Sequence, residues 1–426
     1  MIGDEIYQFA KELWPLNRSI TGNGLRETLQ KVSKHLSKFE IKSVPSGTKV
    51  FDWTVPKEWD VKEAYIITPS GMKICDFSEN NLHLVGYSIP FEGEISFEEL
   101  KTHLHTLPDQ PNAIPYVTSY YEERWGFCLS HEKFNTLERG IYKVVIKSRL
   151  FKGELNYGEL LIKGKSEKEI FLSTYICHPS MANNELSGPC VLTFLAKWLQ
   201  EIDFINYSYR IIFIPETIGS ITYLSQNYKE MKNKIIAGFN VSCIGDDRSY
   251  SYLPSRNGKT LSDLVAKHVL KWIDPNFNEY NWLDRGSDER QYCAPGIDLP
   301  IASIMRTKYG IYPEYHTSLD NLENVVTPGG LDGGYWAIRK AMEAIERNKN
   351  YKIDVLCEPQ MGKRKLYPNL STKKIQDKDT IQTMNFLSFC DGKTSLLNIA
   401  DLLKIPIWEL YELVEKLQSH SLISEN

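Results

Sequence analysis

The chain has 426 residues, of which 42% are hydrophobic and 24% are charged, and its formal net charge is -4 at pH 7. This size and composition are typical of a globular protein with a large core and roughly two to four domains. The small acidic surplus argues against a general nucleic-acid binder and against attraction to an anionic membrane surface.

The first residues of the chain indicate its cellular compartment. The opening segment MIGDEIYQFAKELWPLN carries charges throughout and lacks the apolar core of a signal peptide. No uninterrupted apolar run approaches the length of about 18 residues that suggests a membrane span. The eight cysteines are scattered without a C-x-x-C pair, which favours buried free thiols. We therefore expect a cytoplasmic protein.

Residues 1–50 are predicted to form two helices joined by a turn. Residues 4–16 are amphipathic, residues 17–24 (NRSITGNG) are rich in turn residues, and residues 25–39 place apolar side chains at helical spacing. Because two such helices have no core of their own, we expect them to pack on a later part of the chain.

Residues 51–151 are predicted to form an inserted β-rich domain. Short β-type runs are separated here by turn residues, and one helix-like piece at 96–107 interrupts them. The runs lie at 63–69, 81–88, 114–121, 124–130 and 140–148.

From residue 154 onward, buried-strand patterns alternate with helix patterns. Strands are predicted at 169–176, 207–215, 234–245 and 298–306, and helices at 188–202, 219–232, 258–273 and 329–349. Such alternation predicts an α/β sheet with helices on both faces. The α/β domain then comprises residues 1–50 and 152–350, on either side of the inserted domain.

Residues 351–426 are predicted to form a linker and a winged helix-turn-helix domain. Two short helices, a break at Ile405-Pro406, a third helix and a terminal apolar strand are typical of that module. Residues 373–426 contain six Lys and no Arg against eight Asp and Glu. Since a DNA reader needs positive charge, we expect protein contact or self-association rather than DNA binding.

Polar side chains that suit metal or acid–base chemistry follow several predicted strands. The carboxyl ends of parallel strands meet at one edge of an open α/β sheet, where ligands bind. Imidazole nitrogens and carboxylate oxygens, with one position left for water, are the ligands of zinc in hydrolases. Taken singly, each residue could instead serve a turn or a helix start. The residues are His178, Asn183, Asn184, Glu185, Glu216, Asp246, Asp247, Arg285, Ser287, Asp288, Glu289, His316 and Asp320.

Four segments occur in an order that points to a known group of enzymes. CHPSMANNELSG (177–188), PETIGSITYL (215–224), GSDERQY (286–292) and YHTSLDNLEN (315–324) resemble the metal-dependent aminopeptidases of the zinc exopeptidase fold. More closely, the chain resembles an uncharacterised bacterial aminopeptidase-like family that is often encoded near polysaccharide-biosynthesis genes. The resemblance implies a mixed sheet with helices on both faces, an inserted β-rich domain and a C-terminal winged helix-turn-helix.

The resemblance also implies roles for particular residues. His178 matches the first metal histidine of the group, His316 the last, and Asp288 a common acidic support residue. Glu216 matches one member of a Glu-Glu pair in which one glutamate is the general base and the other binds metal. The alignment leaves open which of these two roles Glu216 takes.

Departures from the family pattern lower the expected number of metal ions. The usual bridging aspartate falls at Asn184, and the usual third-strand aspartate falls near Ser242. A neutral amide offsets less of the charge of two cations than a carboxylate does. We therefore predict one zinc ion rather than two, with an empty, degenerate site as the alternative. The predicted metal-binding residues are His178, Asn184, Glu185, Glu216 and His316.

These observations predict a metal-dependent hydrolase of an amide or ester bond, with Glu216 as its catalytic residue. The expected substrate is a small peptide, or an aminoacyl or acyl sugar. Single-zinc acyl transfer is one alternative, and a non-catalytic binding or assembly protein with a degenerate metal site is another. The predicted substrate contacts are Arg285, Asp288, Arg306 and Tyr315.

Overall fold

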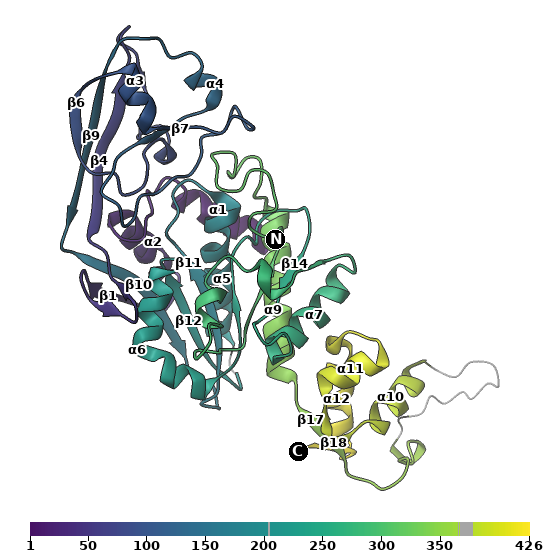
Figure 1. Ribbon diagram of the computed structural model, residues 1–426. Coiled ribbons are helices and arrows are strands. Elements are labelled where there is room, and N and C mark those ends of the chain that lie inside the picture. The colour runs from purple at the N-terminus through teal and green to yellow at the C-terminus, as the bar shows by residue number, and fades with distance from the viewer. Residues whose placement is uncertain (203–204, 365, 367–377) are drawn as a thin grey trace. The chain divides into compact units, whose positions relative to one another are not determined.

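The computed structural model describes residues 1–202, 205–364, 366 and 378–426 (Figure 1). The chain divides into two compact units. The first comprises residues 1–263 and 276–336, and the second comprises residues 264–275 and 337–426. Among the described residues, no helix combines the length and the apolar character that crossing a membrane would require.

An eight-stranded mixed sheet forms the centre of the first unit. Its inner strands β12, β11, β13 and β16 are parallel, whereas β1 and β10 add to one side in antiparallel fashion. Strand β11 is buried at every position, including its polar residues Glu169, Ser173 and Thr174. In sheet order the strands are β1 (Glu40–Pro45), β10 (Glu154–Ile162), β12 (Ser208–Ile214), β11 (Glu169–Tyr175), β13 (Ile235–Asn240), β16 (Ile301–Met305), β14 (Ser251–Leu253) and β15 (Asn278–Glu279).

Helices cover both faces of this sheet, as predicted. Phe213 of β12 packs edge-on against Phe39, which follows helix α2, with ring centroids 5.5 Å apart. Arg210, three residues earlier and therefore on the opposite face, donates to the hydroxyl of Tyr223 on helix α6. The helices of this unit are α1 (Ile2–Leu13), α2 (Asn23–Ser33), α5 (Ser187–Glu201), α6 (Ile218–Lys234) and α8 (Glu289–Tyr292). Helices α7 (Leu261–Ile273) and α9 (Pro328–Arg347) contribute residues to both units.

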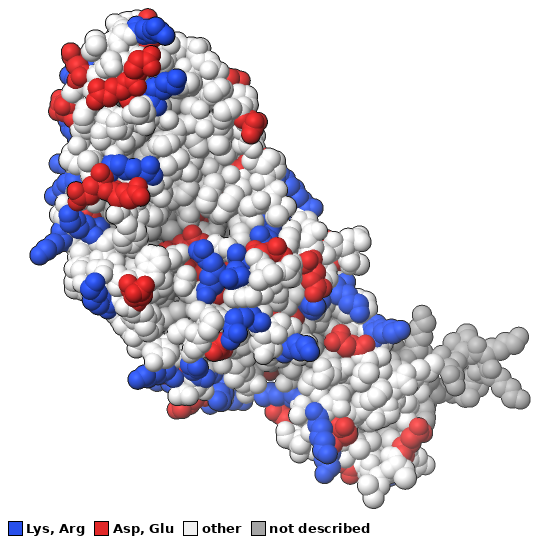
Figure 2. Space-filling model, viewed as in Figure 1, with Lys and Arg blue, Asp and Glu red and all other residues white. Residues whose placement is uncertain are grey.

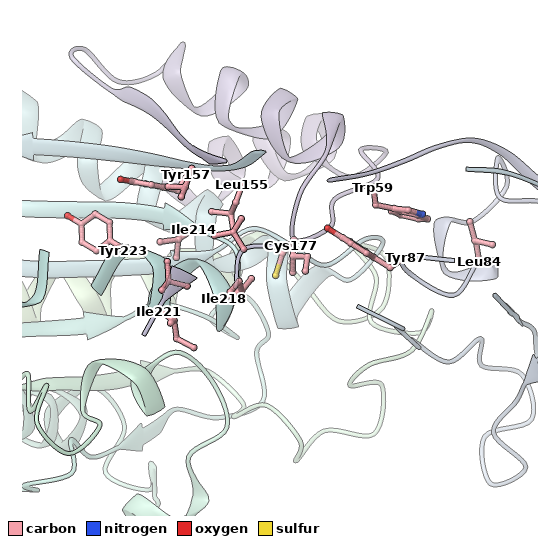
Figure 3. Close-up of a cluster of buried hydrophobic side chains, with 14 of the residues drawn as sticks. Trp59, Leu84, Tyr87, Leu155, Tyr157, Cys177, Ile214, Ile218, Ile221 and Tyr223 are labelled. Carbon is pink, nitrogen blue, oxygen red and sulfur yellow. The ribbon is translucent and has the colours of Figure 1, made fainter. Parts of the chain in front are cut away.

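A four-stranded antiparallel sheet occupies the segment predicted to be β-rich. Its order is β5 (Lys73–Ile74), β4 (Glu58–Ile67), β9 (Ile141–Phe151) and β6 (Phe91–Ser96). Short pairs accompany it: β2 (Lys49–Val50) with β3 (Trp53–Thr54), and β7 (Leu104–His105) with β8 (Phe127–Cys128). One buried hydrophobic cluster runs from Tyr223 and Ile214 beside the large sheet to Trp59 and Tyr87 beside the small one (Figure 3). The domain boundaries at residues 51 and 151 stay predictions.

Some strands and helices predicted in this segment were wrong. Residues 81–83 form a 3-10 turn, because the side chain of Asn80 accepts the N–H of Leu82. Residues 114–121 form only isolated bridges, and Pro115, which lacks an N–H, lies at one of them. The predicted helix at 96–107 is short: α3 (Phe97–Leu100) gives way to a 3-10 turn and then to β7.

The second unit contains a three-stranded antiparallel sheet and three short helices. The strands are β18 (Asp391–Ser395), β17 (Asn350–Ile353) and β19 (Ile423–Glu425), and the helices are α10 (Lys378–Ser388), α11 (Leu396–Leu403) and α12 (Tyr411–Ser419). The break predicted at Ile405-Pro406 is present, because Lys404 ends α11 in the left-handed conformation with a φ of 55°. Residues 365 and 367–374 of the predicted linker lie outside the described residues.

Candidate metal and catalytic site

Three of the predicted site residues line one cavity at the carboxyl ends of the central strands. His178 follows β11, Glu216 follows β12, and His316 lies in the loop between β16 and α9. The cavity has a volume of about 400 Å³. Its lining is Ile20, Trp53, Tyr116, Thr118, Tyr120, Tyr121, Cys177, His178, Glu216, Thr217, Ile218 and His316.

The two imidazoles and the carboxyl group face one another across this cavity. Nε2 of His178 lies 3.7 Å from Oε2 of Glu216. The ring centroids of His178 and His316 are 5.6 Å apart. Nδ1 of His178 lies 3.5 Å from Sγ of Cys177, so that a proton on Nδ1 leaves the Nε2 lone pair directed toward Glu216. The ring of Tyr116 packs against both imidazoles, at centroid distances of 5.1 Å and 5.2 Å.

Burial sets the protonation of all three groups. It lowers the pKa of His178 well below its usual value, and the neighbouring His316 lowers it further. It lowers the pKa of His316 to about 4. Burial, reinforced by the nearby carboxyl group of Asp288, raises the pKa of Glu216 to about 8. Near neutral pH the site therefore holds two neutral imidazoles and a protonated carboxyl group.

Asp288 does not line the cavity but holds the turn that follows Glu216. Its Oδ1 accepts the N–H of Thr217 at 2.7 Å and the hydroxyl of Ser220 at 2.8 Å, at the start of helix α6. Its Oδ2 is buried without a hydrogen-bond partner among the described residues. Burial raises the pKa of Asp288 to about 7. The residue predicted as an acidic support thus holds the turn that carries Glu216.

Two predicted metal ligands do not line the cavity. Asn184 lies in the π-helical turn Ala182–Leu186, where its Oδ1 accepts the hydroxyl of Tyr175 at 3.1 Å. Glu185 pairs with Arg18, whose Nε lies 2.9 Å from Oε2, and both side chains are fully buried. The guanidinium therefore already balances the charge of this carboxylate.

The predicted substrate contacts are scattered. Arg285 is exposed and donates to the carbonyl of Trp282. Nε of Arg306 donates to the carbonyl of Asp246 at 2.6 Å, and its guanidinium lies 3.9 Å from the centroid of the Tyr250 ring. Tyr315 stacks on His316 at a centroid distance of 3.9 Å and thereby orients that imidazole.

Two further aspartates hold the loops of the site in place. Asp320 accepts the N–H groups of Asn183 and Asn184 at 2.7 Å and 2.9 Å. Asp246 accepts the side-chain amide of Asn183 and the N–H of Thr307, both at 2.9 Å. Both carboxylates accept hydrogen bonds from other parts of the protein, and these bonds fix the turn that precedes α5.

Four of the non-glycine residues with left-handed backbone lie around the same edge of the sheet. Ser180, Thr217, Cys243 and His316 have φ values of 45°, 62°, 48° and 58°. This left-handed region is costly for residues other than glycine, and such strain clusters at functional sites. Three of these residues lie in or directly after the segments that carry His178, Glu216 and His316.

The residues that enclose the cavity were not predicted from the sequence. Tyr116, Tyr120 and Tyr121 come from the irregular segment 114–121, and Ile20 comes from the turn between α1 and α2. The segment is fastened over the site, because the N–H of Tyr116 donates to the carbonyl of His316 at 2.9 Å. The many aromatic residues in this segment could have indicated a cavity wall. They are equally typical of the core of a small β-sheet, so the sequence did not distinguish the two.

The chemistry of His178, Glu216 and His316 suits zinc, although their donor atoms are not gathered around a single point. Within the ranges that the structure describes, no group of three or more His, Cys, Asp or Glu side chains could hold a metal ion as it stands. Neutral imidazole and carboxylate are nonetheless zinc ligands, and 3.7 Å is close to the ~3.4 Å between neighbouring ligand atoms in a tetrahedral site. Asn184 is neutral and Glu185 is paired with Arg18, so neither offers the cavity an uncommitted carboxylate.

Two family comparisons cover almost the whole chain. Residues 7–348 match the family described as domain of unknown function (DUF4910), and residues 349–425 match the winged helix-turn-helix family. The second match confirms the predicted C-terminal module.

Individual relatives agree with this assignment. The chain is 45% identical over 399 residues to the "Putative polysaccharide biosynthesis protein with aminopeptidase-like domain" of Clostridium acetobutylicum, covering 93% of this chain and 91% of that protein. The crystal structure of a "putative peptidase" from Clostridium acetobutylicum has 42% identity and a TM-score of 0.93, over 100% of this chain and 97% of the other.

A more distant structure shows the fold alone. A zinc aminopeptidase from Bacillus subtilis matches with a TM-score of 0.58 at 11% identity, over 80% of this chain and 94% of that one. The predicted α/β fold related to zinc aminopeptidases is thereby confirmed.

Proposed function

The chain belongs to the family described as domain of unknown function (DUF4910), and from this membership and the site geometry we propose that it is a metal-dependent hydrolase of an amide or ester bond. One observation carries the proposal: His178, Glu216 and His316, from three separate segments, line a single cavity at the strand ends. The name of the curated relative adds a link to polysaccharide biosynthesis, which suits an acylated or aminoacylated sugar as well as a small peptide.

The chain's own residues would share the work as follows. His178 and His316 supply neutral nitrogen donors, and Glu216 supplies an oxygen, either as a third ligand or as the base beside the ion. A zinc ion held by these residues would supply Lewis-acid chemistry toward the substrate carbonyl. With a cation bound, Glu216 would be a carboxylate and would hold and move a proton at Oε2. The surrounding rings and Ile218 give the cavity a mostly apolar lining.

Elemental analysis of the purified protein tests this function. We expect about one zinc ion per chain, because the donors suit one ion and not two. His316→Ala should lose the zinc, whereas His420→Ala, which changes an exposed histidine on the second unit, should retain it. Absence of zinc after zinc has been supplied would contradict the hydrolase proposal, and two ions per chain would contradict the single-ion site.

A second candidate is a binding or assembly protein that has kept the fold. It is favoured by the open arrangement of the three donors, which the described residues do not close into a metal site. Stoichiometric zinc together with release of a carboxylic acid product would exclude it.

We also propose that the protein acts in the cytoplasm and that its winged helix contacts protein rather than DNA. On the face shown in Figure 2, basic and acidic side chains are interspersed. Helix α12 carries Glu412 and Glu415 against Lys416, which gives it no surplus of positive charge for phosphates.

A further inference from the structure

The irregular segment 114–121 is joined by its backbone to the loop that carries His316. The N–H of Tyr116 donates to the carbonyl of His316, and the N–H of Ser318 donates to the carbonyl of Ile114, both at 2.9 Å. His316 has a left-handed φ of 58°. This conformation is costly for a residue other than glycine, so the surrounding structure must hold it. The segment thus fixes the backbone that presents one of the two imidazoles.

The ring of Tyr116 is in contact with both imidazoles of the site. Its centroid lies 5.1 Å from that of His178 and 5.2 Å from that of His316, the second contact being edge-to-face. Tyr175 contacts only the first imidazole and Tyr315 only the second. Among the described residues, Tyr116 is therefore the one aromatic side chain that joins the two histidines, which come from separate loops.

The far end of the Tyr116 ring is held as well. Its hydroxyl and that of Tyr120 form a hydrogen bond of 2.8 Å. The Tyr120 ring meets Tyr87 edge-to-face at a centroid distance of 5.3 Å, and Tyr87 stacks on Trp59 at 5.6 Å in the buried cluster of Figure 3. A ring that is fixed at its backbone and at its hydroxyl can hold neighbouring side chains in place.

From these contacts we propose that Tyr116 is a positioning residue, whose ring sets the separation and direction of the imidazoles of His178 and His316. A ligand that is already oriented loses less conformational freedom when an ion binds, so the ring raises the affinity of the site for zinc. This inference rests on the proposed function, since zinc is the ion that these imidazoles would hold. It makes segment 114–121 a part of the metal site as well as a wall of the cavity.

Three variants test the role of the ring in zinc binding. Tyr116→Leu removes the ring but keeps the backbone N–H, Tyr116→Phe keeps both, and Tyr65→Leu makes the same substitution on β4, outside the cavity. Competition with a chromophoric chelator gives the dissociation constant for zinc. Tyr116→Leu should bind zinc at least about tenfold more weakly than the parent, whereas the other two variants should stay close to it. Equal affinity of Tyr116→Leu and the parent, or an equal loss in Tyr116→Phe, would overturn the proposal.

A second measurement, on metal-free protein, separates this proposal from the proposed function. The imidazole centroids of His178 and His316 are 5.6 Å apart, so their ring protons should give a nuclear Overhauser cross-peak in the parent and in Tyr116→Phe. The cross-peak should weaken or vanish in Tyr116→Leu. Its absence from the parent, or an undiminished cross-peak in Tyr116→Leu, would overturn the positioning role. If the parent takes up no zinc, the hydrolase proposal fails and the cross-peak alone decides this one.

Urea unfolding shows whether each variant is folded before either measurement is made. If Tyr116→Leu is not folded, Tyr116→Met takes its place, because methionine fills irregular gaps without an aromatic ring. The same outcomes then apply to Tyr116→Met.

Discussion

Glu216, which follows strand β12, and Asp288 are two neighbouring buried carboxyl groups. Neither forms an ion pair with Lys or Arg among the described residues, and burial raises the pKa of both groups, to about 8 and about 7. His178 and His316 nearby are held neutral by the same burial. Near neutral pH these four side chains are therefore largely uncharged. A cation bound in the cavity would favour the ionised, carboxylate form of Glu216.

This arrangement predicts that metal-free protein loses stability as the pH rises from about 7 to about 8. Both carboxyls have folded-state pKa values above the unfolded value of about 4, so the folded state binds more protons in this range and the free energy of unfolding falls with pH. The buried histidines, whose folded-state pKa values are lowered, oppose this trend only below about pH 7, where unfolded imidazoles are still partly protonated. We expect a slope on the order of 1 kcal/mol per pH unit in urea unfolding.

Glu216→Gln should make this slope shallower, because it removes one of the buried carboxyl groups that titrate in this range, to which Glu185 also belongs with a pKa raised by burial to about 7. Glu323→Gln, which alters an exposed glutamate near the site, should leave the slope unchanged. A flat or rising stability over this pH range would show that the two carboxyls are already ionised in the folded protein.

At the scale of elements, the start of helix α5 lies unusually close to the sheet. A Cβ atom added at Gly188 would lie 2.5 Å from the Oγ1 of Thr174 and 2.5 Å from the carbonyl oxygen of Val241. The second of these is backbone and cannot rotate away. The close approach lets the turn Ala182–Leu186 reach the strand ends, where Asp320 receives its N–H groups.

Gly188→Ala should therefore push α5 away from β11 and lower the free energy of unfolding by about 1–3 kcal/mol. Its effect should extend to zinc uptake, because His178 precedes the displaced turn. Thermal unfolding and elemental analysis of the same preparation measure both effects.

Gly329→Ala is the matched control in the first turn of α9. The nearest atom to its added Cβ is the carboxylate oxygen of Asp247, at 3.3 Å, on an exposed side chain that can move. Stability should stay within about 0.5–1 kcal/mol of the parent, since Ala suits a helix better than Gly. Equal effects of the two substitutions would mean that the contact at Gly188 is not special.

At the scale of the whole molecule, the second unit is built from distant parts of the chain. His268 of α7 is fully buried there, and its Nδ1 lies 2.7 Å from a carboxylate oxygen of Asp401. Its Nε2 accepts the N–H of Ile407 at 2.9 Å. One imidazole thus satisfies partners on both sides of the break at Ile405-Pro406.

His268→Ala should loosen the second unit, because the N–H of Ile407 loses its acceptor and a cavity remains. We expect a loss of about 2–4 kcal/mol in that unit, measured by hydrogen exchange of residues 396–425. His420→Ala, at the exposed end of α12, should change exchange little. Unchanged exchange in His268→Ala would show that the unit does not depend on α7.

Local patterns in the sequence were enough to predict the framework of this protein. The alternation of apolar runs and amphipathic helices predicted the α/β sheet, and Pro406 marked the break in the C-terminal module. His178, Glu216 and His316 could be placed at one edge, because the carboxyl ends of parallel strands meet there. These are properties of short segments combined with one general rule of sheet topology.

Only the tertiary structure decided which of the candidate side chains are free to act. Glu185 is taken by Arg18, which lies 167 residues earlier in the chain, and Asp320 is taken by backbone N–H groups 136 and 137 residues away. The cavity wall comes from the irregular segment 114–121, which has no periodic pattern of its own. Such pairings depend on how distant segments pack. The sequence shows that a residue is an acid, but it does not show which group pairs with that acid in the folded protein.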